Sequence, residues 1–136
     1  MYSSIGFIGS GNMAGAIIGG IIRSGILKPE NVFVSDLYQE NADKMAGKYG
    51  VKAMGSNLDV VKNSEVLVLS VKPQVYRTVI EEIKHHIKPE TLIVTIAAGI
   101  SISDVKHFLE ADIKVIRTMP NTPALVGEGD NIYFCN

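Results

Sequence analysis

Short apolar runs alternate along the chain with longer segments in which apolar residues recur at helical spacing. The runs are rich in valine and isoleucine and are apolar almost throughout, which is typical of parallel strands covered on both faces. A weaker run favours a short edge strand, and the last residues also have the pattern of a strand. We predict strands at Ile5–Ile8, Val32–Val34, Val51–Met54, Val66–Leu69, Leu92–Ile96 and Ile113–Ile116, and another within Asn131–Asn136.

The segments between the runs carry residues that begin and end helices. Glycine ends two of them, Ser-x-x-Asp patterns begin two others, and a proline begins the remaining one. The predicted helices cover about Asn12 to Ser24, about Gln39 to Tyr49, a short segment from Ser56, about Pro73 to Ile87, and a segment from Ser101. This alternation predicts an α/β fold, with a doubly wound, mainly parallel sheet and helices on both faces.

Composition narrows the class of protein. The chain has 136 residues, 46% of them apolar, which suits a single domain with a proper core. A formal net charge of -1 gives no electrostatic reason to expect nucleic acid or a membrane as partner. A single cysteine, Cys135, is typical of a reducing compartment. The N-terminus lacks a signal-peptide pattern, so we expect a cytoplasmic protein, and the strand-like ending suggests a fragment of a longer chain.

A glycine-rich turn follows the first predicted strand. It reads Gly9-Ser10-Gly11-Asn12-Met13-Ala14, a G-x-G-x-x-A pattern that opens a helix within a βαβ unit. In such a turn the first glycine permits the sharp bend, the second lets a pyrophosphate approach the backbone, and the small third residue allows close helix packing. The pattern predicts a Rossmann-type, dinucleotide-binding domain over residues 1–136. The alternative is that these glycines only serve a tight connection.

An acidic residue, Asp36, follows the second predicted strand directly. In this fold an aspartate at that place accepts hydrogen bonds from the adenosine ribose and would repel a 2′-phosphate. No arginine follows it, so the chemistry leans towards NAD rather than NADP. The alternative is a solvated turn aspartate that begins the second helix.

Three further segments follow strands, and ligands of open α/β sheets lie across the carboxyl ends of the strands. Val71–Pro73 follows one strand, and the small residues Ala97–Gly99 follow another and leave room for a flat ring. Two prolines stiffen Met119–Pro123 after the last parallel strand, so its polar groups can face a substrate. The alternatives are a solvated lysine at Lys72 and a rigid exit from the sheet at the proline loop.

Four segments occur in an order that resembles one enzyme family: "GFIGSGNMAGAI", "VKPQ", "IAAGIS" and "MPNTPALVGEG". Together they resemble the cofactor domain of pyrroline-5-carboxylate reductase, the last enzyme of proline synthesis, over essentially the whole chain. The resemblance implies hydride transfer from NAD(P)H to the C=N bond of 1-pyrroline-5-carboxylate, giving L-proline. Members are longer, and the helical second half that forms their dimer and much of their substrate site is absent here. The resemblance therefore implies a homo-oligomeric parent protein.

The resemblance also implies roles for particular residues. Many members carry a pair suited to NADP where this chain has Asp36 and Leu37, so the choice between NADP and NAD stays open. The Met119, Pro120, Asn121, Thr122 and Pro123 loop matches the border of the substrate pocket. The residues matched to the cofactor site are Ile8, Gly9, Ser10, Gly11, Asn12, Met13, Ser35, Asp36, Asn57, Val71, Lys72, Pro73, Ala97 and Ala98. For Asn57 the alternative is a cap or turn role.

No residue in the sequence pairs as nucleophile and base, and no cluster has metal-ligand spacing, so we expect no catalytic side chain and no metal here. A protonated imine carries its own positive charge and mainly needs to be held against the nicotinamide. His85 and His86 are expected in the last turn of the fourth predicted helix, and His107 on an exposed helix face. Two other functions stay open: a dinucleotide-binding module without catalysis, and the cofactor domain of a hydroxyacid-type dehydrogenase.

Overall fold

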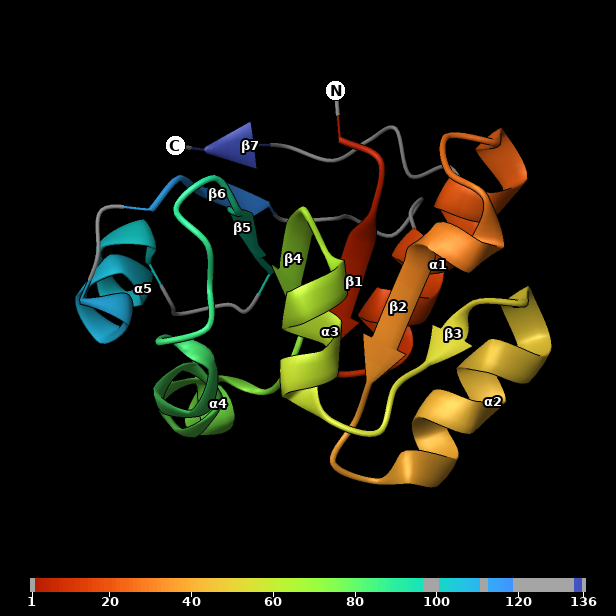
Figure 1. Ribbon diagram of the computed structural model, residues 1–136, viewed down its shortest axis with the longest axis horizontal. Coiled ribbons are helices and arrows are strands. Elements are labelled where there is room, and N and C mark those ends of the chain that lie inside the picture. The colour runs from red at the N-terminus through yellow and green to blue at the C-terminus, as the bar shows by residue number, and fades with distance from the viewer. Residues whose placement is uncertain (1, 97–100, 111–112, 119–133, 136) are drawn as a thin grey trace.

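One mixed sheet organises the molecule (Figure 1). The computed structural model describes residues 2–96, 101–110, 113–118 and 134–135. Within these ranges seven strands lie in the order β3-β2-β1-β4-β5-β6-β7, and only the pairing of β6 with β7 is antiparallel. The prediction of a doubly wound, mainly parallel α/β sheet is confirmed. The strands are β1 (Ile5–Ile8), β2 (Val32–Ser35), β3 (Lys52–Ala53), β4 (Val66–Leu69), β5 (Leu92–Thr95), β6 (Val115–Thr118) and β7 (Phe134–Cys135).

The first three strands extend the sheet to one side of β1, and after β3 the chain crosses back to add β4 on the other side. β1 pairs with β2 on one side and with β4 on the other, so Ile8 lies level with both Ser35 and Leu69. The carboxyl ends of these three central strands therefore meet at one place, the topological switch point where open α/β sheets bind ligands.

Helix ends follow the capping residues closely. α1 (Asn12–Ser24) ends at Gly25 and α2 (Gln39–Tyr49) ends at Gly50, both glycines with left-handed φ angles of 74° and 77°. α3 (Asn57–Asn63) begins where the Ser56 hydroxyl accepts the Asp59 N–H at 3.2 Å. α5 (Ile102–Leu109) begins with a complete capping box between Ser101 and Asp104.

The fourth predicted helix is shorter than expected and begins differently. A 3-10 turn, η2 (Pro73–Val75), leads into α4 (Tyr76–Ile83), whereas we predicted one helix to about Ile87. Ile83 is the last fully buried residue of this helix, and Pro89 disfavours helical backbone just before it. His85 and His86, expected in the last helical turn, instead lie in the turn that follows α4.

Two other differences are small. β6 begins two residues later than predicted, because Ile113 packs into the core before the strand pairing starts. A short 3-10 turn, η1 (Pro29–Asn31), precedes β2 and had not been predicted.

Two cores form, one on each face of the sheet. Helices α1 and α2 cover one face through Ala14, Ile18 and Ala42. Helices α3, α4 and α5 cover the other, to which α4 contributes Ile80 and Ile83. Figure 1 shows α4 and α5 on the left of the view and α1 and α2 on the right. No helix within the described ranges is long and apolar enough to cross a membrane.

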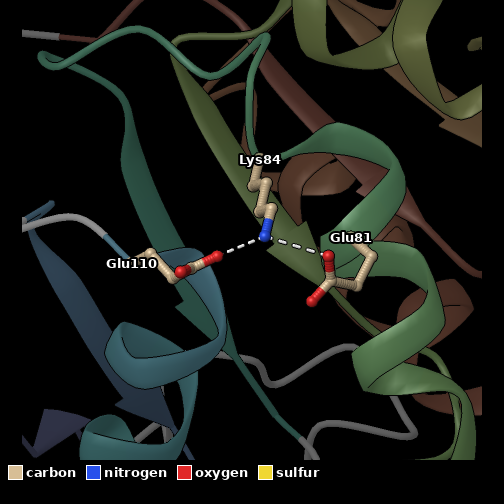
Figure 2. A network of polar contacts seen from close by, with 3 residues as sticks. All are labelled: Glu81, Lys84 and Glu110. Atoms are coloured by element: carbon tan, nitrogen blue, oxygen red, sulfur yellow. Dashed lines mark hydrogen bonds and ion pairs between the residues drawn. The ribbon is translucent and has the colours of Figure 1, made fainter.

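A lysine joins the last two helices at the surface (Figure 2). Lys84, directly after α4, forms an ion pair with Glu81 at 2.9 Å and another with Glu110, the residue that follows α5. Hydrogen bonds from its ammonium group to Glu110 and Glu81 raise the pKa of Lys84. The lysine side chain is only 11% exposed, so most of its aliphatic part is covered by the protein.

Candidate functional site at the carboxyl ends of the central strands

The glycine turn between β1 and α1 is held from both neighbouring strands. The Gly9 N–H donates to the Ser35 carbonyl of β2 at 2.9 Å. On the other side Ser70, directly after β4, donates its N–H to the Ile8 carbonyl at 3.0 Å and its hydroxyl to the Gly9 carbonyl at 2.7 Å. The turn therefore has a fixed position at the switch point.

The two glycines of the turn meet different surroundings. Gly9 has a φ of 101°, and a Cβ there would lie 2.7 Å from the Ser70 carbonyl oxygen, so only glycine suits this position. A Cβ on Gly11 would meet no atom within 4 Å among the described residues. Gly9 thus serves the bend itself, whereas the missing side chain of Gly11 leaves open space beside the backbone.

The N-terminus of α1 offers donors to that space. Gly11 is the N-cap residue, so no side chain caps the helix, and its first turn contains no acidic residue. The first N–H groups of a helix and its dipole attract anions. Ser10, Gly11 and Asn12 line a hollow of about 620 Å³ between α1 and α2, which we call the α1–α2 hollow. Lys44 and Lys48 of α2 line it as well.

Asp36 lies beside the turn and is engaged by protein donors. Its Oδ2 accepts the Ser10 N–H at 2.9 Å and the Ser10 hydroxyl at 2.7 Å. Its Oδ1 accepts the Tyr38 N–H at 2.9 Å and the Asn41 amide at 3.3 Å. Burial raises the pKa of this carboxyl, but the four hydrogen bonds together outweigh burial and lower it. Asp36 therefore connects the glycine turn to the start of α2, and its contact with a ribose stays a prediction.

A second hollow, of about 420 Å³, opens between the ends of β2 and β4 and is called here the β2–β4 hollow. Its surface is mostly apolar, because leucine and valine side chains form much of it. Among the cofactor residues expected from sequence, it brings together Ile8, Gly9, Asp36, Asn57 and Val71.

Asn57 lies in a short polar chain within the β2–β4 hollow. Its Oδ1 accepts the Ser35 hydroxyl at 2.6 Å, and its Nδ2 donates to Glu82 Oε1 at 2.8 Å. Ser35 is buried, with 1% of its surface exposed, so Asn57 is hydrogen-bonded to the protein interior through the Ser35 hydroxyl. Glu82 was missed by the sequence reasoning, since an exposed glutamate on an amphipathic helix gives no signal of its own.

Three other residues expected in the cofactor site, Met13, Lys72 and Pro73, are not among the described lining of either hollow. Lys72 and Pro73 are exposed at the start of η2, and Met13 is 37% exposed on α1. Ala97 and Ala98 and the Met119–Pro123 loop lie outside the described residues. Within the described part of the chain, no group of three histidine, cysteine, aspartate or glutamate side chains could hold a metal ion.

Comparison with known proteins identifies the family. Residues 4–99 match the family model described as NADP oxidoreductase coenzyme F420-dependent, which is more than half of the chain. The chain belongs to this family. The matched residues begin just before β1 and extend beyond β5, so they include both hollows.

Several proteins that are similar to this chain are named pyrroline-5-carboxylate reductases. The reductase of Pseudomonas aeruginosa is 40% identical over 132 residues, which cover 97% of this chain and 48% of that protein. The solved structure from Coxiella burnetii has a TM-score of 0.84 at 33% identity and covers 91% of this chain and 46% of its own. The structure from Plasmodium falciparum, with NADP bound, has a TM-score of 0.84 at 30% identity. The match covers 98% of this chain and 47% of that one. The chain spans about half the length of the curated relatives it matches.

Proposed function

We propose that this chain is the dinucleotide-binding domain of a pyrroline-5-carboxylate reductase. The observation that carries the proposal is the glycine turn, fixed at the switch point of the sheet, with open space at Gly11 and an uncapped helix end. Identity near 40% to proteins of that name over nearly the whole chain supports the choice of reaction. Residues 1–136 would form one domain of a longer chain.

The two hollows fit the parts of a nicotinamide dinucleotide. The N–H groups of α1 near Gly11 would bind the pyrophosphate, because they are free donors at the positive end of a helix. The β2–β4 hollow would hold the adenosine, since its walls are largely apolar and Asn57 offers a polar group. Asp36 is the group nearest the turn that could face the ribose, and Val71, Lys72 and Pro73 would pass beside the cofactor.

The reaction follows from what such a cofactor supplies. When bound, a reduced nicotinamide cofactor would supply a hydride for the C=N carbon of 1-pyrroline-5-carboxylate, and with the proton on the imine nitrogen this gives L-proline. The residues of this chain would bind and orient the cofactor, so that the imine is held at near-attack distance. We propose that Ala97 and Ala98 lie by the nicotinamide and that the Met119–Pro123 loop borders the substrate. A cytoplasmic, homo-oligomeric protein is part of the proposal.

Turnover tests the proposal directly. The longer protein of which this chain would be one domain is mixed with 1-pyrroline-5-carboxylate and NADH or NADPH, and both the loss of reduced cofactor and the formation of proline are followed. Proline formed in proportion to cofactor oxidised is the expected result. Cofactor binding without proline would instead favour the second candidate, a dinucleotide-binding module without catalysis.

A further inference from the structure

A carboxylate that sequence patterns did not indicate lines the β2–β4 hollow. Glu82 lies on α4 and Asn57 begins α3; both line the hollow, and the Asn57 Nδ2 donates to Glu82 Oε1 at 2.8 Å. Asp36 reaches the same hollow from the end of β2. Two acidic side chains from different elements therefore face one space.

The bond between Glu82 and Asn57 also fixes which way the Asn57 amide points. A carboxylate can only accept hydrogen bonds, so the NH₂ group of Asn57 must be the one that faces Glu82. The amide oxygen must then face Ser35, whose hydroxyl donates to it at 2.6 Å. An NH₂ group has two hydrogens, and the second one is available for a ligand in the hollow.

The charged residues that line the β2–β4 hollow, Asp36 and Glu82, are both negative. Among the described residues that line it, none is lysine, arginine or histidine. Lys44 and Lys48 line the α1–α2 hollow, and Lys72 is exposed at the start of η2, outside the described lining of the β2–β4 hollow. A ligand in the β2–β4 hollow thus meets two carboxylates and, from the described lining, no cation to balance them.

We propose that Glu82 is a specificity-determining residue that, together with Asp36, selects a dinucleotide without a 2′-phosphate, so that the chain binds NADH more tightly than NADPH. The inference rests on the proposed function, because it requires that adenosine occupies the β2–β4 hollow. A 2′-phosphate brings close to two negative charges, which the two carboxylates repel, whereas a ribose hydroxyl can be bound by either. Glu82 acts in two ways, through its charge and through the orientation of Asn57.

Two substitutions separate these effects. Glu82→Gln removes the charge but keeps an oxygen that can accept the Asn57 N–H, whereas Glu82→Ala removes both. Glu90→Gln is the matched control, because it removes the same charge beside a third hollow, which Tyr2, Lys62 and Thr91 also line at the amino ends of the strands. Calorimetric titration of each protein with NADH and with NADPH, at one salt concentration, gives the two dissociation constants and their ratio.

We expect the wild type to bind NADH more tightly and Glu82→Gln to strengthen NADPH binding about three- to tenfold, with NADH affinity nearly unchanged. Compared with Glu82→Gln, Glu82→Ala should bind both cofactors more weakly, because it also loses the bond that orients Asn57, and Glu90→Gln should leave the ratio as in the wild type. A wild type that prefers NADPH, or a ratio that Glu82→Gln does not change, would overturn the inference while dinucleotide binding stands. If the wild type binds neither cofactor, the proposed function itself fails and this inference fails with it.

Discussion

Asp36 accepts four hydrogen bonds beside the carboxyl ends of the central strands. It joins the glycine turn to the start of α2 through hydrogen bonds from Ser10, Tyr38 and Asn41. These bonds lower its pKa below the ordinary value of 3.8, even though burial alone would raise it. A carboxyl whose pKa is lower in the folded state stabilises the fold above its unfolded pKa, and this contribution is lost as the pH falls through the folded value.

Replacement of Asp36 by asparagine tests this linkage. Asp36→Asn should lower the free energy of unfolding by about 1–2 kcal/mol at neutral pH, because an amide NH₂ cannot accept the bonds that one carboxylate oxygen now accepts. The loss should shrink at pH values well below 3.8, where the wild-type carboxyl is protonated too. Urea unfolding at neutral pH and at a pH well below 3.8 measures the loss of unfolding free energy. Asp43→Asn, at an exposed position of α2, is the control. A difference that is the same at both pH values would contradict the account.

The hydroxyl of Tyr76 is a buried polar group at this end of the sheet. Tyr76 is 1% exposed, and its hydroxyl lies 2.6 Å from both the Leu69 carbonyl and the Thr95 hydroxyl. Tyr76→Phe should cost about 1–3 kcal/mol of stability, because the Leu69 carbonyl would keep only the 3.4 Å bond from the Ile96 N–H and the buried Thr95 hydroxyl would lose a partner. Denaturant unfolding gives the value, and Tyr2→Phe, at a residue 42% exposed, should change it little. Equal effects of the two variants would show that the buried hydroxyl contributes nothing specific.

At the scale of elements, helix boundaries were predictable where a local signal determines them. Gly25 and Gly50 end α1 and α2 because each adopts a left-handed φ that other residues avoid. The end of α4 depends instead on where Ile83 meets the core, and that is a property of tertiary packing. The same limit applies to the site: the glycine turn is visible as a pattern, whereas the Asn57–Glu82 contact joins residues 25 positions apart on two helices.

The capping box of α5 offers a test at this scale. Ser101→Ala removes the hydroxyl that accepts the Asp104 N–H at 3.0 Å and should cost about 1 kcal/mol of unfolding free energy. Ser103→Ala, at an exposed position inside the same helix, should be neutral or slightly stabilising because alanine is the better helix former. Chemical denaturation compares the two. If both serines gave the same loss, helix propensity rather than capping would explain the Ser101 effect.

At the scale of the whole molecule, the fold brings two kinds of surface together at one end of a sheet. The α1–α2 hollow presents free helix N–H groups and lysines, whereas the β2–β4 hollow presents apolar and acidic side chains. A dinucleotide has matching parts, an anionic pyrophosphate and an uncharged adenosine. The sequence predicted only that a ligand lies across the carboxyl ends of the strands, and the strand order, which places β1 between β2 and β4, locates this meeting point.

Dinucleotide binding at the glycine turn is the central claim, and Gly11→Ala tests it most directly. A Cβ at this position meets no described atom within 4 Å, so the variant should fold, yet the methyl group would occupy the space that a pyrophosphate needs. Gly47→Ala on α2 is the matched control, since its Cβ also meets open space. NADH titration should give wild-type affinity for Gly47→Ala and a loss of about tenfold or more for Gly11→Ala, equal to about 1.4 kcal/mol. Wild-type affinity in a folded Gly11→Ala protein would contradict the account.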